Sequence, residues 1–583
     1  MNRCQKCNLL SSDSSFDSDK NVSSVVEQKI KVFALGGLDE NGKNLYVVEV
    51  NDKIFVLDAG LKYPTEDLLG VDAVIPDFTY LKENVSRVQG IFLSHGHEDH
   101  IGALPQLLSL INVPIYGTRL TMALVEDSLS ENGLDFKNYK LYKIRENNEL
   151  FFGDIKVTFF KTTHSIPDSV AICIHTTDGV IVYTSDFTFD QSAKGRYQTN
   201  YARISEISKE GVLCLLSESI NAEKSGHTST GSSLTYELEE AFSRAEGRII
   251  CSLYSSDLHR IQLVIDLAIQ NGRKIAIIGR KMQRIVDISV KLGYLRIPKS
   301  ALMNLLYIDE KNDNNLSNLV VLATGNRYEP FNALIRMAKH QDRLIHIEKS
   351  DTVIVATAPI PGNEIKAART LDLLYRTGAS VVAINKNLLP SSHASSEDLK
   401  LMMNLLKPQY IMPVIGEYRN LVAHAKIAEK MGYNTENVIL LDNGDVVEFQ
   451  QGELVNHTEH IQIDQVLVDG LGVGDIGSVV LRDRQLMAND GIIVVIANLN
   501  KNTKEIVAGP QIVSKGFVYE KGNEELYAAL DELVRNIIGQ FVTEQYVNWQ
   551  GLRQELRDKI GKLLFNKTKR KPIIIPIVEE FNL

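Results

Sequence analysis

Apolar and polar residues alternate along the first part of the chain, from Lys31 to Gly60, with glycines interrupting the pattern. A period of two residues is typical of half-buried strands, so this segment predicts strands joined by turns. From Val88 to Ile172, apolar strand-like runs alternate with helical stretches such as Leu104–Ile111. The strands predicted from there onward are Gly90–Ser94, Val113–Tyr116, Ile155–Phe160, Val170–His175, Val180–Thr184 and Gly211–Ser217. The pattern indicates an α/β unit with a mixed sheet.

Longer helical and strand-like segments alternate between about residues 234 and 374. Continuous apolar runs of this kind are typical of parallel strands that are covered on both faces. The predicted strands are Arg248–Leu253, Lys274–Gly279, Asn318–Ala323 and Asp351–Ala356. Helices are then predicted at Glu397–Leu406 and Val422–Met431, and strands at Val438–Leu441 and Val446–Gln450. Because these last strands resemble the closing strands of the first unit, the second α/β unit is interpreted as an insertion within the first.

The remainder of the chain predicts a small third α/β domain. The polar stretch Gln451–Gln462 is interpreted as an irregular linker. Strands are predicted at Val479–Leu481 and Ile492–Ala497, and apolar residues at helical spacing predict an amphipathic helix over Glu524–Phe541. Residues 472–477 fit the spacing G-x-G-x-x-G, but the segment after them is predicted as a strand, whereas a dinucleotide site requires a helix. The motif therefore indicates a glycine-rich turn.

Composition narrows the class of protein. The chain has 583 residues, of which 44% are hydrophobic and 23% are charged, so one small module and a largely disordered chain are excluded. The formal net charge of -10 gives no overall attraction to polyanions, so contact with nucleic acid requires a local basic surface. The short basic run Lys567, Lys569, Arg570 and Lys571 fits such a surface or a solvated segment equally well.

No apolar run is long enough to span a bilayer, and the stretch Met1–Ser24 is rich in Ser and Asp. We therefore expect a cytoplasmic protein with no membrane attachment and a disordered polar tail over residues 1–24. Cys173, Cys214 and Cys251 lie in apolar runs and are expected to be buried thiols. The pair Cys4 and Cys7 has no second ligand pair within reach, so we interpret it as incidental.

The sharpest chemical feature is Ser94-His95-Gly96-His97-Glu98-Asp99-His100, between an apolar strand and a helix. Only 13 of the 583 residues are histidines, so three of them within six residues are not expected by chance. Imidazole and carboxylate groups are ligands of zinc and similar cations. A tight turn can direct His95 and His97 to one metal ion and Asp99 and His100 to a second, which predicts a two-metal site.

Further ligands must come from elsewhere in the chain, and two candidates follow predicted strands. His164 would complete the first metal site, and Asp186 would bridge both. Asp58, in Val56-Leu57-Asp58-Ala59-Gly60, is a candidate for orienting a ligand histidine from behind. Taken alone, each of these residues also fits an ordinary turn position.

With these motifs the chain resembles the metallo-β-lactamase superfamily, and the inserted unit resembles its β-CASP branch. After about residue 30, nearly the whole chain is similar to bacterial ribonuclease J. The resemblance is carried by the runs Phe92–Pro105, Thr162–Ser169, Glu397–Met402, Val479–Asp483 and Lys569–Pro576. It implies an αββα sandwich with an inserted β-CASP domain and a small C-terminal α/β domain. The implied boundaries are 25–216 and 375–450 for the metallo-β-lactamase domain, 217–374 for the insertion, 451–464 for a linker and 465–583 for the C-terminal domain.

The resemblance also implies a function. The family consists of metal-dependent ribonucleases that degrade 5′-monophosphorylated RNA in the 5′ to 3′ direction, also cut internally, and act in RNA maturation and mRNA decay. Two zinc ions are expected, with manganese or magnesium as alternatives. Asp99, Asp186 and His393 are then the catalytic residues, with His393 as general acid. The expected partners are RNA and either further copies of the chain, as a dimer or tetramer, or a sister ribonuclease J.

Three departures from the family pattern concern the site itself. Glu218 replaces the usual Asp in Ser217-Glu218-Ser219, where it would support the ligands from behind. The usual motif His-x-Ser-Gly-His, expected to bind the substrate phosphate, reads Leu389-Pro390-Ser391-Ser392-His393. Ile415 replaces a metal-ligating histidine, which weakens the second metal site.

The stretch Ala323–Pro330 also departs from the family pattern. Together these changes resemble the divergent second paralogue of the family in Firmicutes. Two hypotheses follow: a zinc-dependent ribonuclease of reduced activity, and a largely non-catalytic subunit that binds RNA as a scaffold. A small-molecule hydrolase on the same fold is disfavoured, because it needs neither the inserted unit nor the C-terminal domain.

Overall fold

The computed structural model describes residues 28–581 apart from 66, 230, 304–315, 325–329, 360–362, 386–388, 390, 471, 519–521 and 542–546. The predicted tail over residues 1–24, the pair Cys4 and Cys7, and Pro390 lie outside the described residues. So does most of the divergent stretch Ala323–Pro330.

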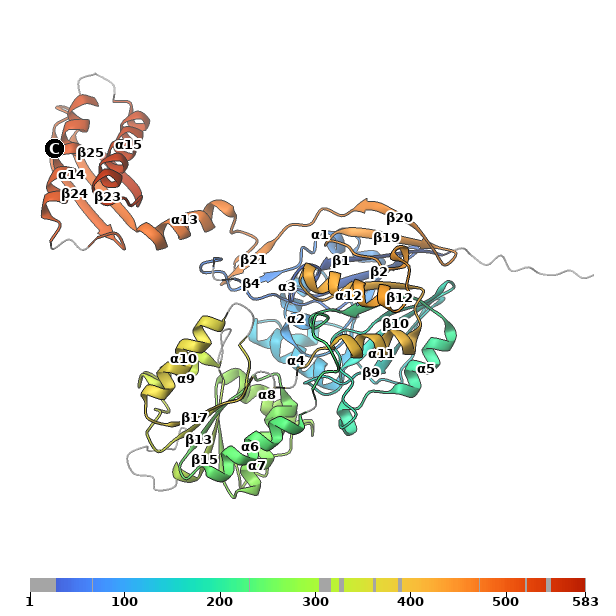
Figure 1. The fold of residues 1–583 in the computed structure, drawn as a ribbon. Coiled ribbons are helices and arrows are strands. Elements are labelled where there is room, and N and C mark those ends of the chain that lie inside the picture. Colours follow the sequence, from blue (N-terminus) through green and yellow to red (C-terminus); the bar gives the residue numbers. More distant parts are fainter. Residues whose placement is uncertain are drawn as a thin grey trace, which may run out of the picture.

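Two sheets packed face to face form the body of the molecule (Figure 1). One has eight strands in the order β20-β19-β1-β2-β3-β5-β6-β7, and the other has six in the order β18-β12-β11-β10-β9-β8. Alternation along the strands turns one set of apolar side chains, including Val32, Phe55 and Ile172, into the space between the sheets. The first sheet comprises β1 Lys29–Gly36, β2 Leu45–Val50, β3 Lys53–Leu57, β5 Val88–Phe92, β6 Ile115–Thr118, β7 Leu141–Ile144, β19 Asp445–Gln450 and β20 Glu453–His460. The second comprises β8 Leu150–Phe152, β9 Ile155–Lys161, β10 Val170–Thr176, β11 Gly179–Tyr183, β12 Val212–Glu218 and β18 Tyr410–Val414.

Helices cover the outer face of each sheet, which confirms the predicted αββα sandwich. The eight-stranded sheet carries α1 Thr79–Glu83, α2 Glu98–Ile101, α3 Leu104–Leu110 and α4 Arg119–Glu131. The six-stranded sheet carries α5 Tyr201–Glu210, α11 Ser396–Leu406 and α12 Tyr418–Lys430. The apolar stripe of each helix supplies the side chains that face the sheet beneath it.

A second α/β unit is inserted between β12 and β18, as the sequence predicted. Its five strands are all parallel, in the order β14-β15-β13-β16-β17. After the insertion the chain returns to the first unit, where β18 pairs with β12 and β19 pairs with β1. The strands are β13 Ile249–Ser252, β14 Lys274–Ile278, β15 Leu319–Ala323, β16 Thr352–Val355 and β17 Ser380–Ala383. The helices are α6 Ser232–Arg244, α7 Leu258–Gln270, α8 Arg280–Lys291, α9 Phe331–Ala338 and α10 Glu364–Arg376.

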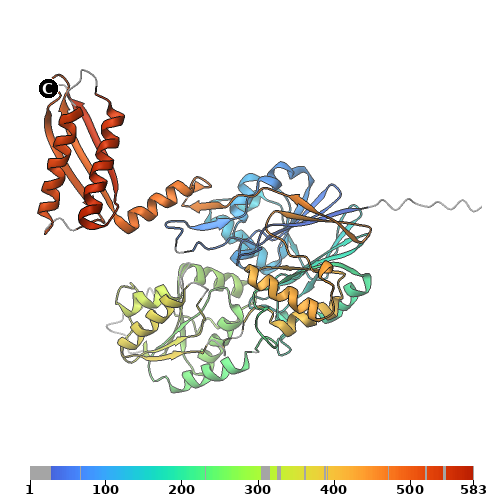
Figure 2. The ribbon, with the colours of Figure 1, turned by 45° about the horizontal axis from the view of Figure 1, so that its top comes forward.

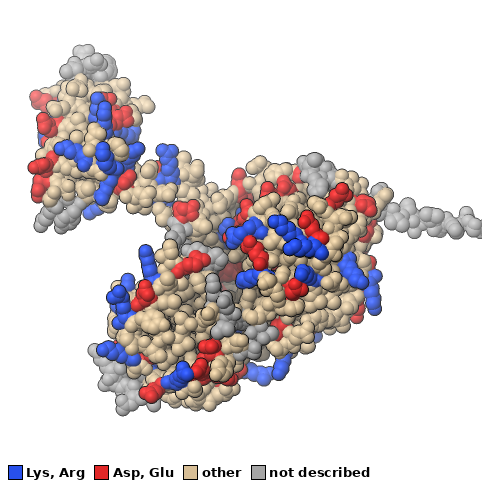
Figure 3. Space-filling model, in the orientation of Figure 1, with Lys and Arg blue, Asp and Glu red and all other residues tan. Residues whose placement is uncertain are grey.

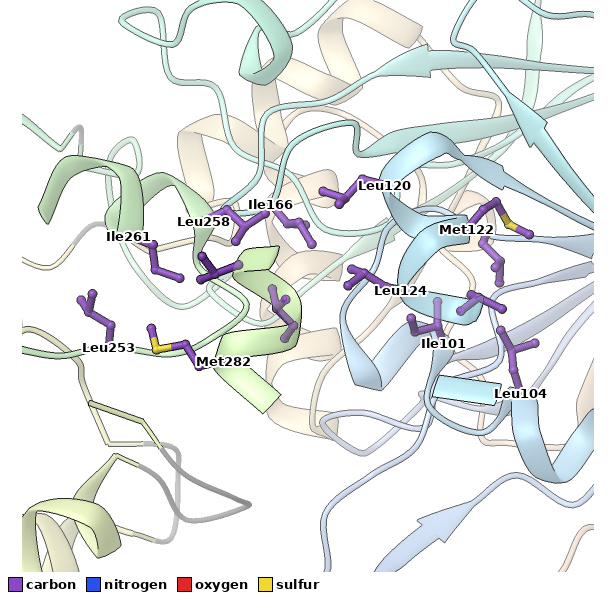
Figure 4. Close-up of a cluster of buried hydrophobic side chains, with 14 of the residues drawn as sticks. Ile101, Leu104, Leu120, Met122, Leu124, Ile166, Leu253, Leu258, Ile261 and Met282 are labelled. Atoms are coloured by element: carbon purple, nitrogen blue, oxygen red, sulfur yellow. The ribbon is translucent and has the colours of Figure 1, made fainter. Parts of the chain in front are cut away.

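The two units share one hydrophobic core (Figure 4). Ile101 and Leu124 of the first unit belong to the same buried cluster as Leu258, Ile261 and Met282 of the insertion. Ion pairs reinforce this contact: the guanidinium group of Arg284 in α8 pairs with Asp127 and Glu131 of α4, and Lys281 pairs with Glu98. Because buried cores are closely packed, the relative position of the two units is fixed by side-chain fit.

The C-terminal domain stands apart from this body at the far end of α13 Ser478–Asp490 (Figures 1 and 2). Three strands, β23 Ile492–Asn500, β24 Ile506–Lys515 and β25 Ile573–Phe581, form its sheet. On one face pack α14 Glu524–Phe541, with the bounds that the sequence predicted, and α15 Trp549–Thr568. Before α13, a small sheet of β4 Ala73–Ile75, β21 Val466–Asp469 and β22 Gly472–Val473 ties the segment to the first unit.

Three local predictions were wrong. Val479–Leu481 begins α13 and is not a strand, because good helix formers such as Leu, Arg, Gln and Met follow the β-branched pair. The stretch Gln451–Gln462 contains β20, which hydrogen-bonds along the sheet edge at β19; this pairing leaves no periodic apolar signal. Val438–Leu441 forms only an isolated bridge, between Val438 and Ile411.

Two other predictions concern burial and hydropathy. Cys173, Cys214 and Cys251 are free thiols and are buried, as expected. None of the helices in the described ranges is long and apolar enough to cross a membrane.

Candidate metal centre

The sequence-predicted ligands meet at one edge of the sandwich, where strands of both sheets end. Asp58 follows β3 and His95 follows β5, and these two strands are parallel. In the facing sheet, His164 follows β9, Asp186 follows β11, and Glu218 ends β12. Strands that run in one direction bring the residues after them to the same edge, so residues more than 100 positions apart become neighbours.

His95, His97, His164 and Asp186 form the first ligand group, with one candidate ligand atom from each within 4.8 Å of the others. The Nδ1 atom of His97 lies 3.1 Å from Nε2 of His164. Asp186 Oδ2 lies 3.7 Å from His95 Nε2 and 3.6 Å from His164 Nε2. Three imidazoles and one carboxylate at these separations match the donor set of a four-coordinate zinc site.

Asp99, His100 and Asp186 form the second group. His100 Nε2 lies 3.4 Å from Asp99 Oδ2 and 3.5 Å from Asp186 Oδ2. Asp186 therefore belongs to both groups. The second group offers three ligands where the first offers four.

These side chains fit a metal ion by two further criteria. His95 Nε2, His97 Nε2 and Asp186 Oδ1 are buried and have no hydrogen-bond partner among the described residues. Buried polar atoms are normally paired, so the unpaired His95 Nε2, which lies 3.7 Å from Asp186 Oδ2, indicates a ligand. Burial lowers the pKa values of His95 and His97 and, with His97 adding to the effect, lowers that of His164 to about 3, which keeps these imidazoles neutral.

The second group attracts positive charge. Burial opposes protonation of His100, but the carboxylates of Asp99, Asp186 and Asp58 outweigh burial and raise its pKa well above the ordinary value. The same carboxylates favour a cation of any kind at this place. The donor sets of both groups therefore suit divalent metal ions.

Asp58 supports the centre from behind through four hydrogen bonds. Its fully buried carboxylate accepts from the backbone N–H and the hydroxyl of Ser94, at 2.8 and 2.7 Å, and from the hydroxyl of Tyr183, at 2.9 Å. It also lies 2.7 Å from His100 Nδ1. A carboxylate at Nδ1 fixes the proton there and turns Nε2 toward the ligand group.

Sequence reasoning missed Asn44 and Tyr46, which line the second group. Asn44 Nδ2 lies 3.1 Å from His100 Nε2, the atom that a second metal ion would need. The Tyr46 hydroxyl lies 3.2 Å from Asn44 Oδ1 and accepts a hydrogen bond from the backbone N–H of Ile415, also at 3.2 Å. Neither Asn44 nor Tyr46 lies in a motif, and only the tertiary contact of Asn44 with the loop of Asp99 and His100 reveals them.

Ile415 follows β18, next to the end of β12, and its side chain is fully buried in the core between the sheets. Its backbone is left-handed, with φ of 54°. A β-branched residue in this conformation is strained by about 1–3 kcal/mol. The N–H of Ile415 donates a hydrogen bond to the C=O of Gly37, and its C=O accepts one from the N–H of Ser219. These two hydrogen bonds hold the backbone in this conformation. An aliphatic side chain at this position supplies no ligand to the centre.

His393 and Glu218 form an ion pair beside the shared carboxylate. His393 Nδ1 lies 2.8 Å from Glu218 Oε2 and 3.7 Å from Asp186 Oδ1. Burial opposes the charged imidazole, but these two carboxylates outweigh it and raise the pKa of His393 to about 9. Burial raises the pKa of Glu218 to about 7, so the shared proton resides on His393.

The described residues of the predicted substrate-binding segment, Leu389–His393, lie in different surroundings. Ser391 and Ser392 line a pocket of about 280 Å³ between the two α/β units, together with His164 and Tyr197. The backbone C=O of Ser392 lies 2.8 Å from His164 Nδ1 and so orients this ligand. The side chain of Leu389 is buried in the shared hydrophobic core, a position that does not fit the substrate-binding role predicted for it.

Comparison with known proteins accounts for nearly the whole chain. Four family descriptions match in order: "Metallo-beta-lactamase superfamily" at residues 38–201, "Ribonuclease J, beta-CASP domain" at 246–374, "Zn-dependent metallo-hydrolase RNA specificity domain" at 379–440 and "Ribonuclease J C-terminal domain" at 479–581. Ribonuclease J2 of Bacillus subtilis strain 168 is 43% identical over 553 residues, covering 95% of this chain and 99% of its own. The chain belongs to the ribonuclease J family.

A second ribonuclease J2, from Staphylococcus aureus strain NCTC 8325, is 40% identical over 551 residues, covering 94% of this chain and 98% of its own. A crystal structure of a protein of unknown function from Enterococcus faecalis V583 shares the fold, with a TM-score of 0.52 and 16% identity. It covers 72% of this ribonuclease J chain and 100% of its own. The predicted resemblance to the second ribonuclease J paralogue is thereby confirmed, and the chain is a metallo-hydrolase of this family.

Replacing Asp58 tests the support behind the ligands. In Asp58→Asn, the amide replaces an acceptor oxygen, so buried donors lose their partner. We expect the free energy of unfolding to fall by about 3 kcal/mol and metal affinity to fall about 10- to 100-fold. Tyr183→Phe removes one of the four hydrogen bonds and should cost about 1 kcal/mol. Equal metal affinities in the two variants, by calorimetric titration, would contradict the orienting role of Asp58.

Replacing Gly60 tests how closely the backbone at this position packs against the loop that carries Asp99. A Cβ at this position would lie 1.6 Å from the backbone oxygen of Asp99, so Gly60→Ala must displace the loop that carries Asp99. We expect a loss of stability of about 1–3 kcal/mol together with weaker metal binding. Gly539→Ala is the matched control, because nothing lies within 4 Å of its Cβ position in α14. Chemical unfolding and metal content measure both effects.

Proposed function

We propose that this ribonuclease J chain is a zinc-dependent ribonuclease that hydrolyses RNA phosphodiesters. It degrades 5′-monophosphorylated RNA in the 5′ to 3′ direction, also cuts internally, and acts in RNA maturation and mRNA decay. The observation that carries the proposal is the carboxylate of Asp186, shared by two ligand groups and next to the His393–Glu218 pair. The similarity to ribonucleases J2 and the matched RNA specificity domain support an RNA substrate.

His95, His97, His164 and Asp186 would hold one zinc ion, and Asp99, His100 and Asp186 a second; manganese or magnesium are alternatives. A divalent ion held there supplies Lewis-acid chemistry for phosphodiester hydrolysis. Side chains of the protein itself supply the proton. Glu218 occupies Nδ1 of His393, which leaves the Nε2–H of the imidazolium to protonate the leaving oxygen.

The pocket between the two units is suited to the 5′ end of the RNA. Tyr197 and His259 lie in its wall with their ring centroids 5.1 Å apart, and a base can stack on such rings. Ser391, Ser392 and the nearby His164 line the same pocket. A terminal nucleotide bound in this pocket would lie next to His164 of the first ligand group, as cleavage from the end requires.

We propose reduced activity because the second ligand group is incomplete. It has three protein ligands, Asn44 occupies the neighbourhood of His100 Nε2, and Ile415 supplies none. The same observation favours a second candidate function, a largely non-catalytic RNA-binding subunit that assembles with a sister ribonuclease J. A homodimer or tetramer accompanies the first candidate. The domain boundaries remain part of the proposal, except the linker at 451–464, because residues 453–460 form β20 of the first unit.

Substitution of single metal ligands distinguishes the enzymatic function from the non-catalytic RNA-binding function. Asp99→Ala and His97→Ala each remove one ligand, so we expect hydrolysis of 5′-monophosphorylated RNA to fall at least about 100-fold. Metal content per chain should fall as well, while RNA binding persists. Asp287→Ala, an exposed carboxylate of α8, is the control. If the unaltered chain hydrolyses RNA no faster than the two ligand variants while still binding it, the scaffold function replaces the enzyme.

Ile415→His tests the cause of the reduced activity. Histidine tolerates the left-handed backbone better than isoleucine and adds an imidazole beside the second group. We expect one more metal ion per chain by elemental analysis and a higher hydrolysis rate. Ile415→Asn relieves the same strain without an imidazole and should change neither metal content nor rate. Unaltered metal content in Ile415→His would show that the missing ligand is not what limits this centre.

A further inference from the structure

A basic surface lies on the C-terminal domain, away from the ligand groups. Six lysine or arginine residues and no acidic residue occur between residues 559 and 571, in a chain whose formal net charge is -10. They are Lys559, Lys562, Lys567, Lys569, Arg570 and Lys571, at the end of α15 and just after it. All six are exposed. We call these six residues the α15 basic surface.

The α15 basic surface surrounds an exposed aromatic ring. The ammonium groups of Lys569 and Lys571 lie 5.2 and 5.1 Å from the centroid of the Phe565 ring, whose side chain is 39% exposed. Lys559 and Lys562 line a groove of about 370 Å³ between α14 and α15, where Glu532 is the acidic lining residue. Figure 3 shows Lys and Arg side chains gathered over the α15 side of this domain.

Stabilisation of the helix end does not account for this surface. Cations favour a helix C-terminus only within about the last turn. Lys559 and Lys562 lie more than one turn before the end of α15 at Thr568, and Lys571 lies beyond the capping residue Lys569. Lys559 pairs with Glu555, at 3.6 Å, but the lysines nearest Phe565 face its ring.

We infer that the α15 basic surface is a second RNA contact, which binds single-stranded RNA through its phosphates while a base stacks on Phe565. Lysines that track phosphates around an exposed aromatic ring are the physical elements of single-strand binding. Because the domain stands off at the end of α13, it holds a part of the RNA remote from the hydrolysed end (Figures 1 and 2). This inference rests on the proposed function only for the identity of the bound polymer.

The test compares two triple variants of the full chain. Lys562→Gln, Lys569→Gln and Lys571→Gln remove three charges from the α15 basic surface. Lys291→Gln, Lys339→Gln and Lys430→Gln remove three exposed charges at the ends of α8, α9 and α12. Both carry Asp99→Ala so that RNA is not consumed. Binding of a single-stranded RNA of about 40 nucleotides is measured by fluorescence anisotropy over a range of salt concentrations.

Loss of three phosphate contacts should lower the slope of log affinity against log salt by about 2 and weaken binding roughly 10- to 50-fold near physiological salt. The control triple should keep the original slope. An RNA of about five nucleotides, too short to reach both sites, should bind both triples alike. Equal slopes in the two triples would overturn the inference. So would altered self-association in sedimentation with unchanged RNA binding, because the surface would then contact protein.

The outcomes also distinguish this inference from the proposed function. If the chain fails to hydrolyse RNA but the two triple variants differ in slope, the second RNA contact stands and the proposed enzymatic function is wrong. If the chain hydrolyses RNA but the two triple variants have identical slopes, the enzymatic function stands and the second RNA contact is wrong.

Discussion

Four hydrogen bonds to the buried carboxylate of Asp58 are the interaction on which the centre depends. They join the end of β3 to the loop after β5 and, through the hydroxyl of Tyr183, to the facing sheet. A buried carboxylate is stable only when donors surround it, so each donor is also held in place by the charge. His100 thereby has its Nδ1 proton fixed, and His95 is placed by the neighbouring hydroxyl of Ser94, 3.0 Å from its Nδ1. One side chain thus sets the orientation of ligands that belong to both groups.

The hydrophobic core shared by the two α/β units also helps to fix the positions of the ligand residues. Gly96, between the first two ligand histidines, lies against Leu124, which belongs to the cluster that includes Met282 of the insertion. The inserted unit therefore supports the ligand loop as well as forming the wall of the pocket. His393 reaches the centre from the segment that leaves the insertion, where Glu218 holds it.

Much of this arrangement could be predicted from the sequence, for identifiable reasons. Three histidines at the end of an apolar strand specify both the chemistry and the place of the centre. Asp58, His164 and Asp186 also follow apolar strands, so their positions were predictable from periodicity. Asn44 was not predictable, because its role comes from a tertiary contact with His100, 56 positions later.

Tertiary contacts also explain several features that the sequence did not predict correctly. The left-handed backbone at Ile415, the core position of Leu389 and the strand β20 all result from tertiary contacts that leave no local pattern. The helix at Ser478–Asp490 was missed because three apolar residues outweighed the helix formers that follow.

The pairing of β1 with β19 has a consequence for how the protein is made. Lys29 lies opposite Gln450, and Phe33 lies opposite Val446, so the first strand of the sandwich is completed by one of its last. Contacts between residues so distant along the chain form late and slowly. A ribosome must therefore release the entire insertion before the N-terminal sheet can close. Until then, the growing chain exposes the unpaired edge of β1, although β2 and β3 can already pair on its other side.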